Sequence, residues 1–146
     1  KDKLFYLASP FTYQGPRLAS CSSLHHKRVS ALLNQRIHKA TVCSIKLAQQ
    51  GIFVISPIAY NGPWIDIDPS LPTDWDFWKE YDINFLKRCD NLIVLKLDGW
   101  ESSIGVKEEI QWFELNRKDK KIIYTTVEEI FSGQLKERFL KLYAEE

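Results

Sequence analysis

The sequence predicts an α/β fold: one domain, residues 1–146, with a mainly parallel sheet of four to five strands and helices on both faces. Short apolar runs that are typical of buried strands alternate with longer segments whose apolar residues recur at helical spacing. Strands that alternate with helices are joined by crossover connections, which give a mainly parallel sheet. A chain of 146 residues has the usual length of one domain and buries most of its unfolded surface without a disulfide or a metal.

Four short apolar runs are the expected strands. The first three end at pairs that are typical of turns, which are Ser9-Pro10, Ser56-Pro57 and Asp98-Gly99. The runs are LFYLA (4–8), IFVIS (52–56), NLIVLKL (91–97) and KIIYT (121–125).

Helices are expected between and after these strands. Residues 24–50 repeat apolar side chains at helical spacing up to Gly51, which is a common stop just past a helix end. The other expected helices are 74–88, a segment that begins near residue 104, and an amphipathic stretch after residue 126.

Two segments are expected to be loops. Residues 12–23 are rich in turn-forming residues. Residues 57–73 hold four of the six prolines, and we expect them to form a long connection. A loop of this length inside a compact domain is usually functional or disordered. Its aromatic and apolar residues argue against disorder, so we expect a functional loop.

The composition bears on partners and location. Twenty Lys and Arg against nineteen Asp and Glu leave a net charge of +1, which gives no reason to expect a nucleic-acid polymer or a membrane surface as partner. No stretch approaches the roughly 20 apolar residues of a membrane span, and the N-terminal apolar run is too short for a signal peptide. The three cysteines are scattered, so a reducing compartment is expected, and we predict a cytoplasmic protein.

One cluster raises the question of a metal. Cys21, His25 and His26 lie close together, but their spacing matches no common zinc pattern and no second ligand pair follows. We therefore expect a solvated loop or helix start in this segment, and we predict neither a metal nor another cofactor.

The predicted topology indicates where a ligand would bind. In open parallel sheets, ligands bind outside the carboxyl ends of the strands, where the strand order reverses. Ser9-Pro10, Ser56-Pro57 and Asp98-Gly99 all lie at such ends. The helix that begins near residue 104 starts just beyond the third, so its N-terminal N–H groups face the crevice and can hold an anion.

Two carboxylates, Glu108 and Glu109, lie in this helix. Helical geometry allows either one to be half-buried at the edge of an apolar face. Both are also compatible with simple exposure, because carboxylates near a helix start are favoured by the helix dipole by roughly 0.3–1 kcal/mol. The spacing alone therefore leaves the choice between them open.

Several segments are informative when they are taken together and in order. They are YLASP, the Arg-containing first helix, GIFVISPI, DWDFWKEYD and LKRCDNLIVLKLDGWESSIGVKEEI. In this order they resemble the nucleoside 2-deoxyribosyltransferase superfamily, over roughly residues 4–124, and within it a branch of unknown function that is common in phages and bacteria. The resemblance implies a flavodoxin- or Rossmann-like fold, a small nucleoside or nucleotide as ligand, and a homodimer or higher homo-oligomer whose neighbouring subunit completes the pocket.

The resemblance also implies roles for individual residues. The superfamily's Gly-x-x-x-Glu-Ile segment matches Gly105 to Ile110, which makes Glu109 the nucleophile. Asp82, eight residues before Asp90, matches a residue that contacts the base or sugar and is often the proton donor. In the mechanism that the resemblance implies, the helix N-terminus keeps Glu109 ionised and the pocket around Asp82 holds a proton. The remaining expected substrate contacts are Tyr6, Ser9, Pro10, Trp75, Ser103 and Gly105.

Ser103 bears on the type of reaction. It lies six residues before Glu109, where the transferases usually have an Asp and the nucleoside 5′-monophosphate N-glycosidases have a phosphate-binding Ser. We therefore predict cleavage of the N-glycosidic bond of a nucleoside 5′-monophosphate through a covalent glycosyl-Glu intermediate. Those hydrolases also have a Ser and an Arg where this chain has Pro10 and Thr12, so Arg17 or Arg28 would have to supply the positive charge.

Other interpretations stand beside these. The protein could be a transferase that exchanges bases, a nucleotide-binding sensor without turnover, or a flavodoxin-like signalling domain, although the acidic cluster expected of the last is absent from the first strand end. Asp82 could pair with Lys79 or Arg88 on its own helix. Ser103 could act only as a helix cap. Tyr6 and the two tryptophans Trp75 and Trp78 could belong to the core.

Overall fold

The computed structural model describes residues 3–11 and 23–144, with side chains from residue 31 onward in the first helix. The four strands form one all-parallel sheet in the order β2-β1-β3-β4, which confirms the predicted α/β fold. The strands are β1 (Leu4–Ala8), β2 (Phe53–Ile55), β3 (Asn91–Leu95) and β4 (Ile122–Thr125). The helices are α1 (Ser23–Gln49), α2 (Pro57–Ile67), α3 (Trp75–Leu86), the 3₁₀ turn η1 (Trp100–Ser102), α4 (Ile104–Asn116), α5 (Val127–Ser132) and α6 (Gln134–Leu142).

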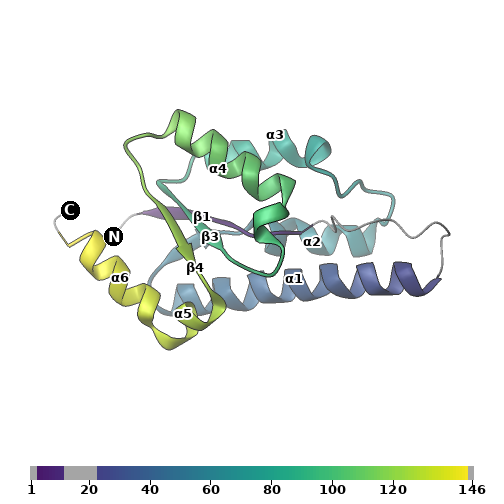
Figure 1. Cartoon of the computed structure of the whole chain (residues 1–146), viewed down its shortest axis with the longest axis horizontal. Helices are drawn as coiled ribbons and strands as arrows, with labels where there is room; N and C mark the ends of the chain where they lie inside the picture. Colours follow the sequence, from purple (N-terminus) through teal and green to yellow (C-terminus); the bar gives the residue numbers. More distant parts are fainter. Residues whose placement is uncertain (1–2, 12–22, 145–146) are drawn as a thin grey trace.

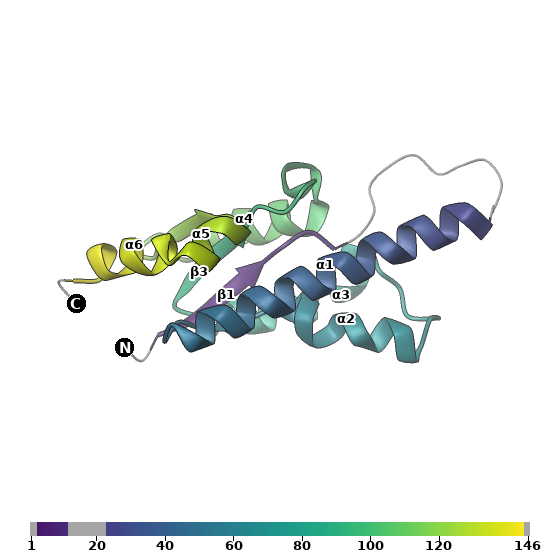
Figure 2. The same cartoon turned by 90° about the horizontal axis from the view of Figure 1, so that it is seen from below.

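Helices cover both faces of the sheet, as predicted (Figure 1). Successive side chains of a strand point to opposite faces. Phe5 and Leu7 of β1 therefore pack with buried side chains of α1, α5 and α6, while Tyr6 and Ala8 pack with those of α3 and α4. Figure 2 shows α1 running along its face of the sheet with α2 beside it. The strand alternation thus directs Tyr6 toward the α3–α4 layer.

The order of the strands reverses at β1. From β1 the chain goes to β2 on one side and then returns to β3 on the other, so that Tyr6 is in register with Ile55 and with Leu92. Loops that leave neighbouring strands in opposite directions open a crevice at this point. The crevice therefore lies beyond Ala8, where β1 ends.

Helix α2 corrects our expectation of a loop over residues 57–73. Ser56 caps the helix, since its side chain accepts a hydrogen bond of 3.2 Å from the backbone N–H of Ala59. Pro57 occupies the first helical position, where the missing N–H of proline is no loss. Pro63 lies inside the helix. We had given the prolines too much weight, because packing against α1 outweighs the cost of an interior proline.

The contact between α2 and α1 is close. A Cβ atom placed on Gly62 would lie 2.5 Å from Cγ1 of Ile37 in α1, so only glycine fits without a shift of the neighbour. This approach fixes α2 against α1 at the carboxyl end of β2. In the described part of the chain, no helix is long and apolar enough to cross a membrane.

Candidate active site

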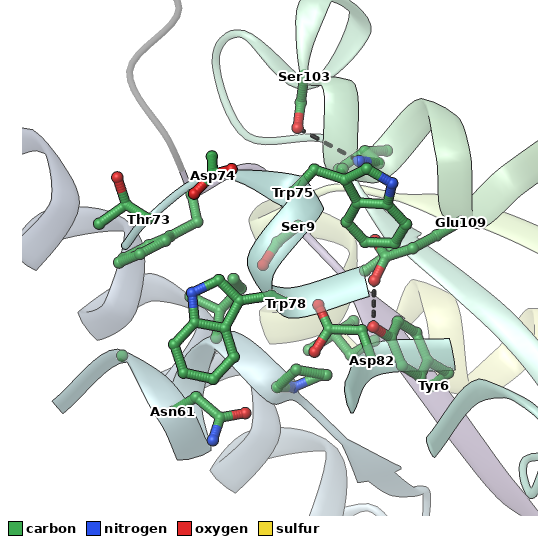
Figure 3. Close-up of a pocket in the computed structure, with 18 of the residues that line it drawn as sticks. Tyr6, Ser9, Asn61, Thr73, Asp74, Trp75, Trp78, Asp82, Ser103 and Glu109 are labelled. Atoms are coloured by element: carbon green, nitrogen blue, oxygen red, sulfur yellow. Dashed lines mark hydrogen bonds between the residues drawn. The ribbon is translucent and has the colours of Figure 1, made fainter. Parts of the chain in front are cut away.

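A cavity opens at the carboxyl end of β1 (Figure 3). Its walls come from the end of β1, one face of α2, the start of α3 and the first turns of α4. The cavity has a volume of about 60 Å³. Since one water molecule needs roughly 10–15 Å³ of such a cavity, the space is larger than a packing defect. Most of the residues that we predicted as site residues line it: Tyr6, Ser9, Trp75, Asp82, Ser103, Gly105 and Glu109.

Glu109 reaches the cavity from α4. Its side chain is buried, with 6% of the residue exposed, and it lines the cavity wall. The hydroxyl of Tyr6, which is fully buried on β1, donates a hydrogen bond to Oε2 of Glu109. Glu108 is exposed on the outer side of the same helix. The structure thus resolves the choice that helical spacing left open, because only Glu109 faces the cavity.

Asp82 reaches the same cavity from α3, and 9% of it is exposed. Figure 3 shows its carboxyl group beside the Tyr6 hydroxyl, on the same side of the cavity as the carboxyl of Glu109. Among the described residues Asp82 forms no ion pair, and Arg88 instead donates to the backbone oxygen of Asn84. Burial raises the pKa of Asp82 to about 7. A simple surface ion pair on α3 is therefore not its role in this structure.

The two carboxyl groups influence each other. Burial, followed by the charge of Asp82, raises the pKa of Glu109 well above its usual range, while the hydrogen bond from Tyr6 opposes this rise. Two like charges in one buried site disfavour double ionisation, so the pair retains a shared proton up to near-neutral pH. Burial and both carboxylates raise the pKa of Tyr6 well above its usual range, so its hydroxyl remains a donor.

This electrostatic picture corrects one expectation. We expected the N-terminus of the helix to keep Glu109 ionised. The helix begins at Ile104, which puts Glu109 beyond its first turn, and the effect of the helix dipole falls off within that turn. The Tyr6 hydroxyl, rather than the dipole, is the described group that lowers the pKa of Glu109.

Ser103 both caps α4 and lines the cavity. Its side chain accepts a hydrogen bond of 3.3 Å from the backbone N–H of Val106, and it is buried. The N–H groups at the start of a helix have no partner within the helix. Gly105 is in that first turn, with the Trp75 indole against it: a Cβ on Gly105 would lie 3.5 Å from Cε3 of Trp75. The first turn of α4 is therefore a wall of the cavity as well as a helix start.

Trp75 and Trp78 form an aromatic wall on α3. Both are half-buried, both line the cavity, and neither belongs to the buried core clusters on the two faces of the sheet. Trp78 donates from Nε1 to the backbone oxygen of Pro72 at 2.8 Å, and its ring centroid lies 6.2 Å from that of Trp64 in α2. These contacts hold the indole at the junction of α2 and α3.

One expected contact lies off the cavity wall, and one residue of the wall was not predicted. Pro10 is buried but does not line the cavity, whereas its neighbours Ser9 and Phe11 do. We also missed Asn61, which lines the cavity from α2 and is 6% exposed. The Ser-Pro pair at 56–57 is a capping signal that could have revealed α2, and with it the face that carries Asn61.

The charged side chains that line the cavity in the described part of the chain are acidic: Asp74, Asp82 and Glu109. Arg36 of α1 lies nearby and donates to the backbone oxygens of Phe11 and Asp98, at 3.0 Å each, which joins the segments after β1 and β3. No group of three or more His, Cys, Asp or Glu among the described residues is placed to hold a metal ion.

Several residues from the sequence analysis lie outside the described part of the structure. They are Thr12, Arg17 and Cys21, together with the side chains of His25, His26 and Arg28.

Fold and site together define a class: an α/β protein with a parallel sheet and two buried carboxyl groups in a cavity at the strand-order reversal. The chain belongs to the family described as "Domain of unknown function (DUF1937)", which matches residues 3–126. The sequence matches no curated protein. The family match spans β1 to β4 and every residue that lines the cavity, whereas α5 and α6 follow it.

Proposed function

We propose that the protein is an enzyme that cleaves the N-glycosidic bond of a nucleoside 5′-monophosphate or a nucleoside through a covalent glycosyl-Glu109 intermediate. The observation that carries this proposal is the pair of buried carboxyl groups, Glu109 and Asp82, in one cavity, with the Tyr6 hydroxyl bonded to Glu109. Enzymes that cleave glycosidic bonds with retention use two carboxyl groups of unlike protonation, one as nucleophile and one as acid.

In the first step Glu109 is the nucleophile. A carboxylate oxygen of Glu109 bonds to C1′ as the bond from C1′ to the base nitrogen breaks. The bonding electrons leave with the base, which takes a proton from Asp82. In the second step water attacks C1′ and gives a proton to Asp82, and the ester bond to Glu109 breaks. The products are the free base and the sugar or sugar phosphate.

The surroundings of the two carboxyls support this division of roles. The hydrogen bond from Tyr6 favours the ionised form of Glu109, whereas burial and the charge of Asp82 oppose it, so the proposed roles require the shared proton to lie on Asp82 when the substrate is bound. The pKa of about 7 at Asp82 suits a group that must give up a proton and regain it near neutral pH. Two carboxyls whose environments differ can thus take the acid and nucleophile roles.

The rest of the cavity supports a nucleoside-like ligand. Trp75 and Trp78 offer aromatic surface against which a base can stack. Ser103 and the first turn of α4 offer N–H and hydroxyl groups suited to an anion such as a 5′-phosphate. A helix N-terminus is the physical basis for the monophosphate part of the proposal.

The acidic lining favours a second candidate. Because the charged groups that line the cavity in the described residues are all carboxylates, a neutral nucleoside meets less repulsion there than a monophosphate does. A nucleoside substrate is the one that a base-exchanging deoxyribosyltransferase uses. In that reaction a second base, instead of water, would attack C1′ of the glycosyl-Glu109 intermediate.

The test is base release by purified protein from a panel of ribo- and 2′-deoxyribonucleosides and their 5′-monophosphates, followed by chromatography. We expect release from at least one substrate, loss of release in Glu109→Gln, and retention in Glu108→Gln, the matched exposed neighbour. Mass spectrometry of the protein during turnover should find the mass of the sugar added at Glu109. If ligands bind but no panel member releases base, with or without an acceptor base, the protein is a sensor and the proposal is wrong.

A further inference from the structure

Asn61 is a buried polar residue that the reaction described above does not use. It is 6% exposed, and neither Nδ2 nor Oδ1 has a hydrogen-bond partner among the described residues. Buried polar side chains in native proteins are nearly always hydrogen-bonded, because leaving them unpaired is costly. An amide with both ends unpaired at the wall of a cavity therefore indicates a ligand that pairs with it.

The backbone holds Asn61 in place. One face of α2 lines the cavity, and its residues follow helical spacing: Pro57, Ile58, Asn61, Gly62 and Ile65. This face is fixed by the Ser56 cap at its start and by the close contact of Gly62 with Ile37. The amide thus belongs to a rigid wall, and its orientation does not depend on a loop.

The position of Asn61 relative to the carboxyl pair indicates which part of a ligand it would meet. In the view of Figure 3, Asn61 and the Trp78 indole lie on one side of the Asp82 carboxyl and Glu109 lies on the other. In the proposed reaction the sugar lies at Glu109 and the departing base lies at Asp82. Anything attached beyond the glycosidic nitrogen then extends toward Trp78 and Asn61.

We propose that Asn61 selects the base, by accepting one hydrogen bond at Oδ1 and donating another from Nδ2 to adjacent polar groups on the edge of a heterocycle. The identification of the ligand as a base depends on the proposed function. An uncharged amide suits an uncharged ring that presents a donor beside an acceptor. A site with buried polar groups also rejects a ring that lacks them, because the amide would then stay unpaired.

Binding measurements in the inactive Glu109→Gln background test this without turnover. Calorimetry would compare adenine, guanine, cytosine and thymine nucleosides, in ribo and 2′-deoxy forms and as 5′-monophosphates, with the corresponding forms of unsubstituted purine. We expect at least one natural base to bind ten-fold or more tightly than unsubstituted purine. Adding Asn61→Leu should reduce this preference to less than three-fold, and Asn61→Asp, which keeps the size but removes the donor, should reduce it too.

A control and a stability measurement exclude a merely structural role. Asn116→Leu makes the same change at an exposed residue. Asn116 lies at the C-terminal end of α4, whereas the cavity lies at the N-terminal end, so this variant should keep the preference for the natural base. Because the Asn61 amide bonds to no described residue, Asn61→Leu should not lower the melting temperature. A preference that survives both Asn61 variants, or the absence of any preference in the panel, would overturn the inference.

The results separate this inference from the proposed function. If wild-type protein releases no base while the preference still depends on Asn61, the glycosidic chemistry is wrong and the base-reading role stands. If base release depends on Glu109 but the preference among bases is the same in the Asn61 variants, the proposed reaction stands and the inference about Asn61 is wrong.

Discussion

The hydroxyl of Tyr6 on β1 donates a hydrogen bond to the carboxylate of Glu109 on α4, and both residues line the cavity. The bond joins the sheet to the helix and also affects the charge of the carboxylate. It lowers the pKa of Glu109, whereas burial and the charge of Asp82 raise it. Removing only the hydroxyl therefore tests the electrostatics of the site.

Tyr6→Phe should keep the core and weaken the nucleophile. With the hydrogen bond gone, the pKa of Glu109 rises further, so the pH at which the carboxylate becomes active moves upward and the maximal rate falls by about ten-fold or more. The free energy of unfolding should change by about 1 kcal/mol, the usual size for one buried hydrogen bond. Rates from pH 5 to 9 and urea unfolding measure both, and Tyr124→Phe, at a partly exposed tyrosine, is the control. An unchanged pH profile would contradict the assignment.

Asp82 should set the high-pH limit of activity. As a proton donor it must be protonated, and its pKa lies at about 7. The rate should therefore fall as the pH rises through about 7. In Asp82→Asn the reaction should be slower, and this decrease in rate at high pH should disappear. Base release from pH 5 to 9 by both proteins measures the effect. If the decrease in rate at high pH persists unchanged in Asp82→Asn, another group donates the proton.

Asp82 should also destabilise the fold at neutral pH. Burial raises its folded-state pKa from 3.8 to about 7, so the folded protein binds more protons than the unfolded chain within this window. Its contribution to the free energy of unfolding is therefore complete below about pH 4 and is lost as the pH rises to about 7. Asp82→Asn should match wild type near pH 4 and exceed it at pH 8, by a few kcal/mol at most. Urea unfolding at both values measures this, and an equal difference at both would contradict it.

The tight contact between α2 and α1 should be sensitive to a single methyl group. Gly62→Ala brings a Cβ within 2.5 Å of Cγ1 of Ile37, and overpacking of this kind costs about 1–3 kcal/mol. Urea unfolding should show this loss, and base release should fall because α2 is a cavity wall. Gly105→Ala is the matched control for stability alone, since its Cβ would make an ordinary contact of 3.5 Å and alanine is the better helix former.

A second substitution separates the clash from an effect of helix propensity. Ile37→Ala removes the atoms that the new methyl group would meet, so the double variant should be more stable than the sum of the single changes predicts. Additive effects would mean that the two side chains do not press against each other.

The strands were predictable because each is a short apolar run, as expected of parallel strands buried on both faces, and the first three also end at a turn signal. The choice between Glu108 and Glu109 could not be predicted from helical spacing, because both lie at the border of an apolar face. Only the packing of the folded chain makes Glu109 buried and Glu108 exposed. The resemblance pointed to Glu109, which the structure places in the cavity. The pKa of Glu109 was missed because the sequence does not reveal the depth of burial.

Helix α2 shows how one wrong element hides part of a site. Four prolines between residues 57 and 73 suggested a loop, although Pro57 only starts the helix and Pro63 is tolerated within it. Because we expected a loop, we could not assign residues 57–67 to the faces of a helix. We therefore had no reason to expect Asn61 in the same cavity as the two carboxyl groups. The low helix propensity of proline is outweighed here by the tertiary contact between α1 and α2.

Ser103 offers a way to decide between a monophosphate and a nucleoside as substrate. Its side chain caps α4, and Asp caps helices about as well as Ser does, so Ser103→Asp should keep the helix start stable. A carboxylate there would repel a 5′-phosphate bound at the first turn, and it would not affect an uncharged 5′-hydroxyl in the same way. The ratio of kcat/KM for a monophosphate to that for its nucleoside should therefore fall by about ten-fold or more. Ser103→Ala, which loses the cap at a cost of about 1 kcal/mol but adds no charge, is the control for helix fraying. A ratio that stays constant in Ser103→Asp would place the phosphate elsewhere or remove it from the substrate.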